Sequence, residues 1–343
     1  MIKNNKGIAV IAVIIPIILV AVIGVILVAS GVINFNIKQV IPTSLKSYGD
    51  KKVLYIDSYH EGYDWSDGIT RGIEDVVGDT DIEFKIHRMD TKRNPSEEFK
   101  KEAAKSAKKV VEDFDPDVLI VSDDNAFKYL VMAYYKDDDL PIVFSGLNWD
   151  ASLYGAPYSN TTGMVEVSLT VELIELLKEY GEGGKVGYLS ADTITERKNE
   201  EYYKKLFDLE FDQVYFVATF ADWKSAYKSL QNQVDVILFE NNAGIADWSD
   251  KRAENFAIAN VEVPVGTTNP WTMQSSLLGL TKVPEEQGEW SAKTVLRILD
   301  GENVSEIPLV NNKKGELHLN LKMAEELEVI FKSSEIKNAV VYE

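Results

Sequence analysis

The 343-residue chain contains no cysteine. This absence excludes a disulfide framework, a cysteine-ligated zinc site, a thiol nucleophile and a lipid anchor on an N-terminal cysteine. Positive charge is also scarce, because 36 lysine and arginine residues face 55 aspartate and glutamate residues, for a formal net charge of −19. Nucleic acids and anionic lipids attract basic surfaces, so neither is expected as a partner.

The familiar enzyme motifs are missing as well. The sequence has no GxSxG, no glycine-rich phosphate loop ending in Lys-Ser/Thr, and no HExxH. Ser58 and His60 lie two positions apart, which keeps a hydrolase as an alternative, but no oxyanion loop or third triad member is recognisable nearby. The pair Asp123-Asp124 lacks the spacing of an oxygen cage for Ca²⁺ or Mg²⁺. We therefore expect neither catalysis nor a metal or cofactor.

What the sequence does have is a long apolar N-terminal run, Ile8 to Val28, preceded by Lys3 and Lys6. As a helix this run spans about 31 Å, which matches a bilayer core. A cleaved signal peptide is the alternative, although its apolar region is usually shorter. We predict a membrane anchor or signal segment over residues 1–33 and a linker over 34–50. Both alternatives place the soluble domain on the extracellular or periplasmic side of the cell membrane.

The stretch from Lys52 to Asp67 begins the soluble domain. Its residues 53–56 form a short apolar run that is typical of a buried parallel strand. A polar, aromatic loop follows, and Ser66 and Asp67 suit the start of a helix. A strand, a recognition loop and a helix are the first unit of a doubly wound α/β domain, in which ligands gather where strands end.

Strand and helix patterns alternate through most of the remaining chain. We expect strands near 82–89, 118–121, 141–144 and 161–167, and then near 185–189, 214–218, 234–239 and 264–266. The tail departs from this rhythm, with a helix over 285–299, short strands near 307–310 and 316–319, and two further helices. Two successive runs of strand and helix predict two doubly wound parallel-sheet lobes.

Side chains suited to ligand binding recur where these strands end. Hydroxyls and amides suit a carboxylate, carboxylates suit an ammonium group, and tyrosine and tryptophan suit an apolar body. Loops of this kind are also polar because they cap helices, so part of the set is expected only to cap. The candidates are Ser58, Tyr59, Trp65, Ser122, Asp123, Asp124, Asn125, Ser145, Asn148, Trp149, Ser190, Asp192, Thr193, Glu240, Asn241, Asn242, Thr268, Asn269 and Trp271.

A strand order of 2-1-3-4 would place the topological switch point between the first and third strands of each lobe. In the first lobe that order brings Ser58-Tyr59 next to Ser122-Asp123. In the second lobe it brings Asp192-Thr193 next to Glu240-Asn241.

Three segments resemble a known family. The opening SYHEGYDWSDGITRGIE, the segment EQGEWSAKTVLRILDGENVSEIPL, and the closing GELHLNLKMAEELEV with its AVVYE tail are similar to ABC-transporter substrate-binding proteins of the type I periplasmic-binding fold. The resemblance covers residues 51–343 in order. It implies two α/β lobes joined by a hinge of several crossings, with a small ligand clamped between them, and no catalysis.

On this resemblance, the first lobe is expected over 51–162 plus about 277–302, and the second over 163–276 plus about 303–343. The expected protein is a monomer that serves an ABC permease and binds an amino-acid-like ligand. Glu240 or Asp123 would then meet its ammonium group, while Ser58, Ser122 and backbone N–H groups meet its carboxylate. Many bacterial members are held by a lipidated cysteine, which the N-terminal helix would replace here. An extracellular sensory domain is the alternative function.

Overall fold

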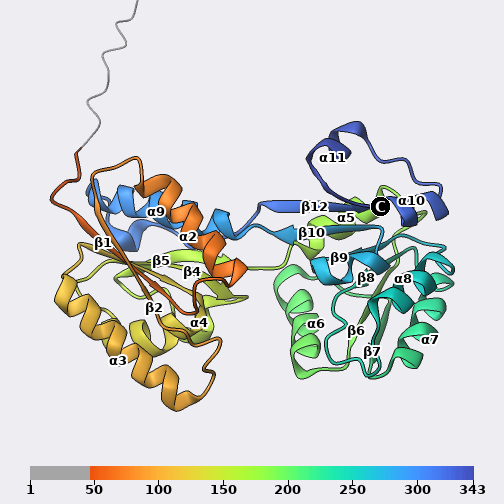
Figure 1. Cartoon of the computed structure of the whole chain (residues 1–343), viewed down its shortest axis with the longest axis horizontal. Helices are drawn as coiled ribbons and strands as arrows, with labels where there is room; N and C mark the ends of the chain where they lie inside the picture. The colour runs from red at the N-terminus through yellow and green to blue at the C-terminus, as the bar shows by residue number, and fades with distance from the viewer. Residues whose placement is uncertain (1–46) are drawn as a thin grey trace, which may run out of the picture. The chain divides into compact units, whose positions relative to one another are not determined.

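The computed structural model describes residues 47–343, of which Tyr48–Glu343 form one compact unit. The predicted anchor at 1–33 and most of the predicted linker lie outside the described residues. Within residues 47–343, no helix combines the length and the apolar character needed to cross a bilayer. Two β-sheets, each the centre of one lobe, organise the unit (Figure 1).

The first sheet is parallel throughout, in the order β11-β5-β4-β3-β1-β2. The chain moves outward from β1 to β2 and then returns to the other side of β1, so the switch point lies between β1 and β3, as the assumed order requires. The strands are β1 (Lys52–Asp57), β2 (Glu83–Arg88), β3 (Val118–Ser122), β4 (Ile142–Asn148), β5 (Thr161–Glu166) and β11 (Val310–Asn311).

Both faces of the first sheet are buried. Along β1, Val53 and Tyr55 point to one face, which α2 (Asp64–Val77) and α9 (Pro284–Leu299) cover. Leu54 and Ile56 point to the other face, which α3 (Glu97–Phe114), α4 (Asp123–Ala126) and the π-helix η1 (Phe127–Tyr135) cover. Burial on both faces explains why β1 reads as a continuous apolar run.

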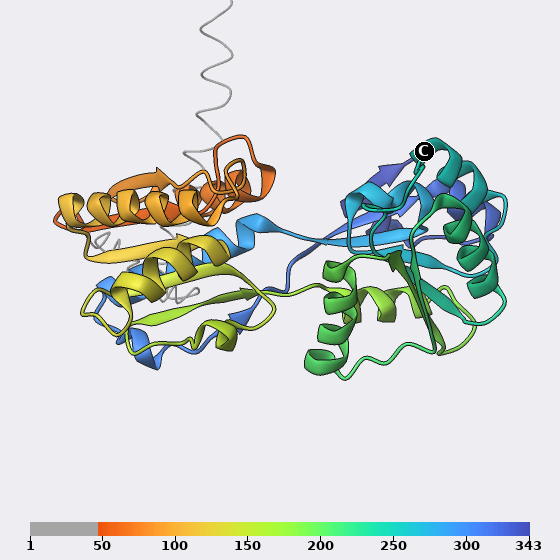
Figure 2. The same cartoon turned by 90° about the horizontal axis from the view of Figure 1, so that it is seen from below.

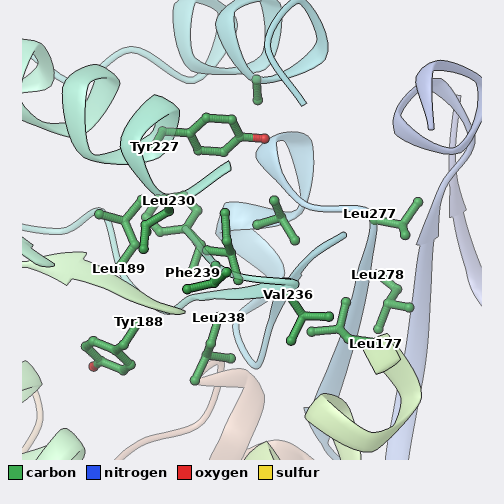
Figure 3. Close-up of a cluster of buried hydrophobic side chains, with 14 of the residues drawn as sticks. Leu177, Tyr188, Leu189, Tyr227, Leu230, Val236, Leu238, Phe239, Leu277 and Leu278 are labelled. Atoms are coloured by element: carbon green, nitrogen blue, oxygen red, sulfur yellow. The ribbon is translucent and has the colours of Figure 1, made fainter. Parts of the chain in front are cut away.

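The second sheet runs β13-β12-β10-β9-β8-β6-β7, and its pairs are parallel except for the antiparallel pair β10–β12. Its core includes Tyr188, Tyr227 and Phe239 (Figure 3). The strands are β6 (Val186–Ala191), β7 (Gln213–Val217), β8 (Val236–Phe239), β9 (Val265–Thr267), β10 (Leu278–Lys282), β12 (Gly315–Asn320) and β13 (Val340–Tyr342). The helices are α5 (Thr170–Lys178), α6 (Ile194–Phe207), α7 (Phe220–Gln231), α8 (Asp250–Ile258), α10 (Leu321–Glu326) and α11 (Ser333–Asn338), with the 3₁₀ turns η2 (Ala151–Tyr154), η3 (Pro270–Ser275) and η4 (Val304–Glu306) elsewhere in the chain.

The chain crosses between the lobes three times, near residues 167–169, 283 and 312–314 (Figure 2). The sheets divide the chain differently from the expected boundaries: β5 and β11 belong to the first sheet, and β10 belongs to the second. The strands expected near 307–310 and 316–319 therefore lie in different sheets. An apolar strand pattern shows that a segment is buried but not which sheet it joins, so the lobe of β10 is known only from its pairing with β9 and β12.

The returning helix α9 packs closely against α2, and glycines allow the close approach. A Cβ atom on Gly288 would lie 2.0 Å from the Ile69 carbonyl oxygen, and one on Gly72 would lie 2.2 Å from the Glu285 carbonyl oxygen. Gly68 faces Pro284 in the same way, at 2.3 Å. Neither the backbone atoms that face Gly72 and Gly288 nor the rigid proline ring that faces Gly68 can move aside as a flexible side chain can, so these positions require glycine.

We predict that Gly288→Ala lowers the free energy of unfolding by about 1–3 kcal/mol or more, since the added methyl group forces α9 away from α2. Gly184→Ala is the matched control, because a Cβ there meets no atom within 4 Å. Urea unfolding of both variants measures the effect. Equal stability of the two variants would contradict the close packing of α2 and α9.

Candidate functional site

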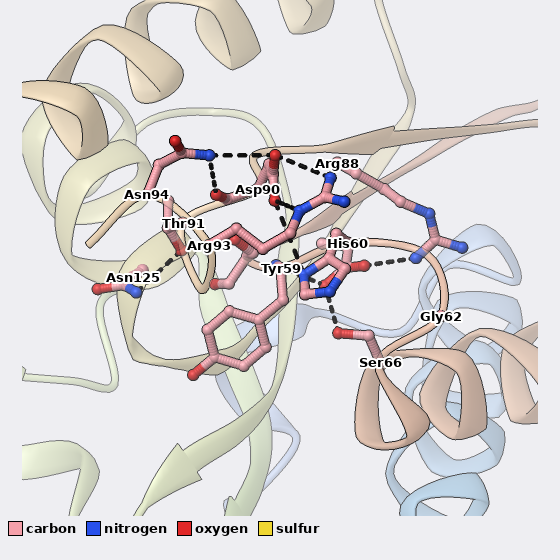
Figure 4. A network of polar contacts seen from close by, with 12 residues as sticks. Tyr59, His60, Gly62, Ser66, Arg88, Asp90, Thr91, Arg93, Asn94 and Asn125 are labelled. Atoms are coloured by element: carbon pink, nitrogen blue, oxygen red, sulfur yellow. Dashed lines mark hydrogen bonds and ion pairs between the residues drawn. The ribbon is translucent and has the colours of Figure 1, made fainter. Parts of the chain in front are cut away.

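The first loop is fixed by a buried carboxylate at the end of β1. Asp57 accepts hydrogen bonds from the Tyr59 N–H and the Ser66 hydroxyl, both at 2.9 Å, and its other oxygen pairs with Arg88 at 2.5 Å. Arg88 and Ser66 thus converge beneath the loop that carries Tyr59 and His60 (Figure 4). A paired and fully hydrogen-bonded carboxylate of this kind holds the loop to both β2 and α2.

Ser58 is part of the framework and lines neither of the two cavities described below. Its hydroxyl donates to the Ser122 carbonyl at 2.5 Å and accepts from the Ala126 N–H at 2.7 Å. The Ser122 hydroxyl is itself within 2.8 Å of the Tyr55 hydroxyl. Among the described residues, Ser58 makes no hydrogen bond to His60, so these two side chains do not form a nucleophile and its base. Both serines join strand ends, and neither is placed to receive a ligand carboxylate.

Asp123, directly after β3, is the exceptional side chain of this edge. It is 2% exposed, and its Oδ1 accepts a hydrogen bond of 3.0 Å from the Trp65 indole N–H. Its Oδ2 has no hydrogen-bond partner within residues 47–343. Its φ of 66° is in the left-handed region, and Gly146, at φ 68°, leaves room because a Cβ there would lie 3.0 Å from Oδ1. Strained backbone around an unpaired buried carboxylate is typical of a functional position.

Burial raises the pKa of the Asp123 carboxyl well above its usual range. The negative charges of Glu166, Asp57 and Asp124 raise it further, while the hydrogen bond from Trp65 opposes the shift. Burial also raises the pKa of the Tyr59 hydroxyl, with Asp123 the next largest cause. Removing an anion from water among like charges disfavours its charged form, so this edge would be stabilised by an incoming cation.

A cavity of about 760 Å³ opens on this edge. Its walls combine aromatic rings, among them Tyr59 and Trp65, with Asp123 and with residues of the second lobe. Tyr59 and Tyr63 pack edge to face with ring centroids 5.3 Å apart. The second-lobe residues lining it include Thr268, Asn269 and Trp271, which follow β9. The cavity is therefore a site to which both lobes contribute, at the carboxyl ends of their strands.

A second cavity, of about 440 Å³, shares Asn148, Glu166, Thr268, Asn269 and Lys282 with the first. Glu166 ends β5 and Lys282 ends β10, and the two form an ion pair across the crossing strands. The Lys282 ammonium also lies 5.5 Å from the Trp65 ring centroid. The shared walls make the two cavities one continuous site.

Glu240, at the end of β8, forms the floor of the second cavity. Its carboxylate accepts hydrogen bonds from the Tyr203 hydroxyl at 3.1 Å, the Thr268 hydroxyl at 2.6 Å and the Asn269 amide at 2.8 Å. Burial raises the pKa of the Glu240 carboxyl to about 7. The nearby negative charge of Glu196 also raises this pKa, whereas the hydrogen bonds from Thr268 and Tyr203 lower it. Both carboxylate oxygens of Glu240 already accept hydrogen bonds, so this residue holds Tyr203, Thr268 and Asn269 in place in the cavity wall.

Trp149 belongs to the first lobe by sequence and to the second by packing. Its ring stacks on Tyr202 of α6 with an interplanar angle of 2° and centroids 5.5 Å apart, and it meets Tyr203 edge to face. The adjoining Asp150 accepts a hydrogen bond of 3.2 Å from the Lys205 ammonium. Trp149 has φ 65°, so the turn after β4 directs it into the α6 surface. Trp149 therefore lines the smaller cavity and also joins the two lobes.

The structure brings together part of the candidate set. The candidates that line the two cavities are Tyr59, Trp65, Asp123, Asp124, Asn148, Trp149, Glu240, Asn241, Thr268, Asn269 and Trp271. Those that line neither cavity are Ser58, Ser122, Asn125, Ser145, Ser190, Asp192, Thr193 and Asn242.

Four of the candidates outside the cavities have other side-chain or backbone partners, whereas the buried Ser145 hydroxyl has none among the described residues. Asn125 donates to the Thr91 hydroxyl at 2.9 Å, and Ser190 donates to Glu196 at 3.1 Å. Asp192 pairs with Arg197, and the Thr193 hydroxyl accepts the Glu196 N–H at the start of α6. Helix capping, an exposed ion pair and hydrogen bonds to neighbouring side chains thus account for these four residues, as the sequence allowed for part of the set.

Several lining residues escaped the sequence prediction. Glu166 follows the same strand-end rule as the candidates and could have been found with it. Lys282 escaped it because the expected boundaries place β10 in the first lobe, whereas this strand pairs with β9 and β12 in the second sheet. On α6, Glu196, Asn199 and Tyr203 all line the smaller cavity, and their helical spacing marks one face of the helix.

A model of the family described as "ABC transporter substrate binding protein" matches residues 62–341. The chain belongs to this family. Its members bind substrates outside the cytoplasm, and the predicted family membership is confirmed. No curated protein sequence matches this substrate-binding protein.

Solved structures share the fold at low sequence identity. A ligand-free, open substrate binding protein with adhesive properties from Clostridium difficile has a TM-score of 0.65 at 15% identity, covering 85% of this chain and 99% of that one. A LacI transcriptional regulator from Lactobacillus brevis has a TM-score of 0.50 at 17% identity, covering 78% of this chain and 99% of that one. An ABC domain in complex with L-Trp from Streptococcus pneumonia has a TM-score of 0.49 at 16% identity, covering 85% of this chain and 99% of that one. The predicted α/β fold with parallel-sheet lobes, that of type I periplasmic-binding proteins, is confirmed.

Glu240 makes the stability of this substrate-binding protein depend on pH. Because its folded pKa of about 7 exceeds the unfolded value of 4.5, the folded state holds the proton more tightly. The free energy of unfolding therefore falls as pH rises from 4.5 to 7, by about 3 kcal/mol for this group. We predict that Glu240→Gln removes this component of the slope between pH 5 and pH 8, whatever its effect on absolute stability.

Urea unfolding at both pH values measures the slope, with Glu201→Gln, an exposed glutamate of α6, as the matched control. A Glu240→Gln protein that keeps the full pH dependence of the unchanged protein would contradict the assignment.

Proposed function

We propose that this chain is the extracytoplasmic solute-binding component of an ABC importer. It takes a small polar or amphipathic ligand, amino-acid-like, into the cavities between its two lobes. The observation that carries the proposal is the pairing of a buried, half-satisfied carboxylate, Asp123, with aromatic walls from both lobes. Such a mixture of apolar surface and a few directed polar groups is typical of small-molecule sites.

The proposed binding residues are the lining candidates. Asp123 receives an ammonium group, Tyr59, Trp65 and Trp271 enclose the apolar body, and Asn148 and Asn269, on opposite lobes, offer amide groups. The three crossings act as the hinge, so closure around the ligand brings the two walls together. The chain acts as a monomer, held at the membrane through residues 1–33, and delivers its ligand to a permease.

Isothermal titration of the Tyr48–Glu343 unit against amino acids, nucleosides and sugars tests the proposal. We expect heat with amino acids, and a loss of about tenfold in affinity for Trp271→Ala, which removes one aromatic wall. Tyr134→Ala is the matched control, since this partly exposed aromatic lines neither cavity. Binding of sugars alone, or equal affinities of the two variants, would contradict the proposal.

A further inference from the structure

The walls of the two cavities carry more acidic than basic side chains. The acidic ones are Asp64, Asp123, Asp124, Glu166, Glu196, Glu240, Glu285 and Glu316, and the basic ones are Arg71, Lys92, Lys198 and Lys282. Two of the basic side chains are already paired, Arg71 with Glu285 and Lys282 with Glu166. The surplus of negative charge favours a ligand with positive charge over one that is neutral or anionic.

Asp123 differs from Asp124 and Glu240 because one of its carboxyl oxygens, Oδ2, has no hydrogen-bond partner among the described residues. Asp124 accepts hydrogen bonds from the Asn148 amide at 2.6 Å and the Tyr154 hydroxyl at 2.9 Å. Glu240 has the three donors described above. Asp123 has only the Trp65 indole, on Oδ1, and its buried Oδ2 is unpartnered among the described residues. A buried acceptor left in this state needs a donor from outside the chain.

The aromatic rings of the larger cavity already face positive charge. The Lys92 ammonium lies 5.2 Å from the Tyr59 ring centroid and 4.8 Å from that of Tyr63. The Lys282 ammonium lies 5.5 Å from the Trp65 centroid. These distances are those of cation–π contacts, in which the negative face of a ring attracts a cation. Lys92 is an exposed side chain, so a ligand cation can take its place over the rings.

We propose that the ligand is an organic cation, whose ammonium group donates to Asp123 Oδ2 while its flat apolar body lies among Tyr59, Trp65 and Trp271. A carboxylate on the ligand is not required. This inference rests on the proposed function, because it names the class of ligand for the same site.

The surroundings of Asp123 explain why an ammonium group fits there. Three carboxylates act on Asp123 as negative charges: Asp57 on β1, Asp124 on α4 and Glu166 on β5. Arg88 is paired with Asp57, and Lys282 is paired with Glu166. Burial and these charges raise the pKa of the carboxyl, so they disfavour its anionic form in the free protein. A bound ammonium group offsets these charges and favours the carboxylate.

Three probes that share a phenyl group but differ in charge test the inference. 2-Phenylethylamine carries only an ammonium group, L-phenylalanine carries an ammonium group and a carboxylate, and 3-phenylpropionate carries only a carboxylate. Isothermal titration of the full chain at pH 8 is expected to show binding of the amine and no binding of the acid. Asp123→Asn is expected to weaken binding of the amine by about tenfold to 100-fold. Glu98→Gln, an exposed glutamate of α3 that lines neither cavity, is the control and is expected to change it little.

A second variant, Trp65→Phe, keeps an aromatic side chain but replaces the indole and its N–H donor with a smaller phenyl ring, so it tests the site while Asp123 itself is kept. It is expected to weaken amine binding less than Asp123→Asn does. Binding of L-phenylalanine without binding of the amine would overturn the cation inference and leave the proposed function standing. Binding of 3-phenylpropionate, or of none of the three, would also overturn the inference. Binding of sugars alone would overturn both proposals.

Discussion

One hydrogen bond, from the Trp65 indole to the Asp123 carboxylate, depends on most of the first lobe. It requires β1 and β3 to be neighbours, so that the loop before α2 reaches the residue after β3. It also requires the open space above Gly146, where a side chain would press on the carboxylate. The result is a buried acid among other acids at the switch point of a parallel sheet, where such folds bind ligands.

The arrangement of the rest of the chain serves to hold this edge and to place a second wall opposite it. The glycines of α2 and α9 fix the helix that carries Trp65 against a segment that returns from the second lobe. The strands β5 and β10 end in Glu166 and Lys282, so the ion pair of the cavity lies where the chain crosses between the lobes. Motion at the crossings would therefore act directly on the charges around Asp123.

Local patterns predicted the first strands, because buried parallel strands leave a continuous apolar signal. The strand order around β1, assumed from doubly wound folds, matches the sheet, and the candidates Tyr59 and Asp123 line the larger cavity. They also favoured Ser58 and Ser122, whose hydroxyls bond to neighbouring strand ends. Sequence cannot separate a serine that binds a ligand from one that ties two strands together. The lobe of β10 depends on which strands it pairs with, and the packing of Trp149 on α6 depends on residues far apart in the chain; a local apolar pattern shows neither.

The most direct test of this account is the titration of the Asp123 carboxyl in the ligand-free protein, followed by ¹³C NMR of labelled aspartate and assigned with Asp123→Asn. The account predicts a carboxyl that stays protonated well above the ordinary aspartate range, since it is buried beside three other acids. A carboxyl that titrates near the ordinary value of about 4 would contradict it. Such a result would mean that Asp123 is already solvated or paired, and that the site has no unmet charge for a ligand to satisfy.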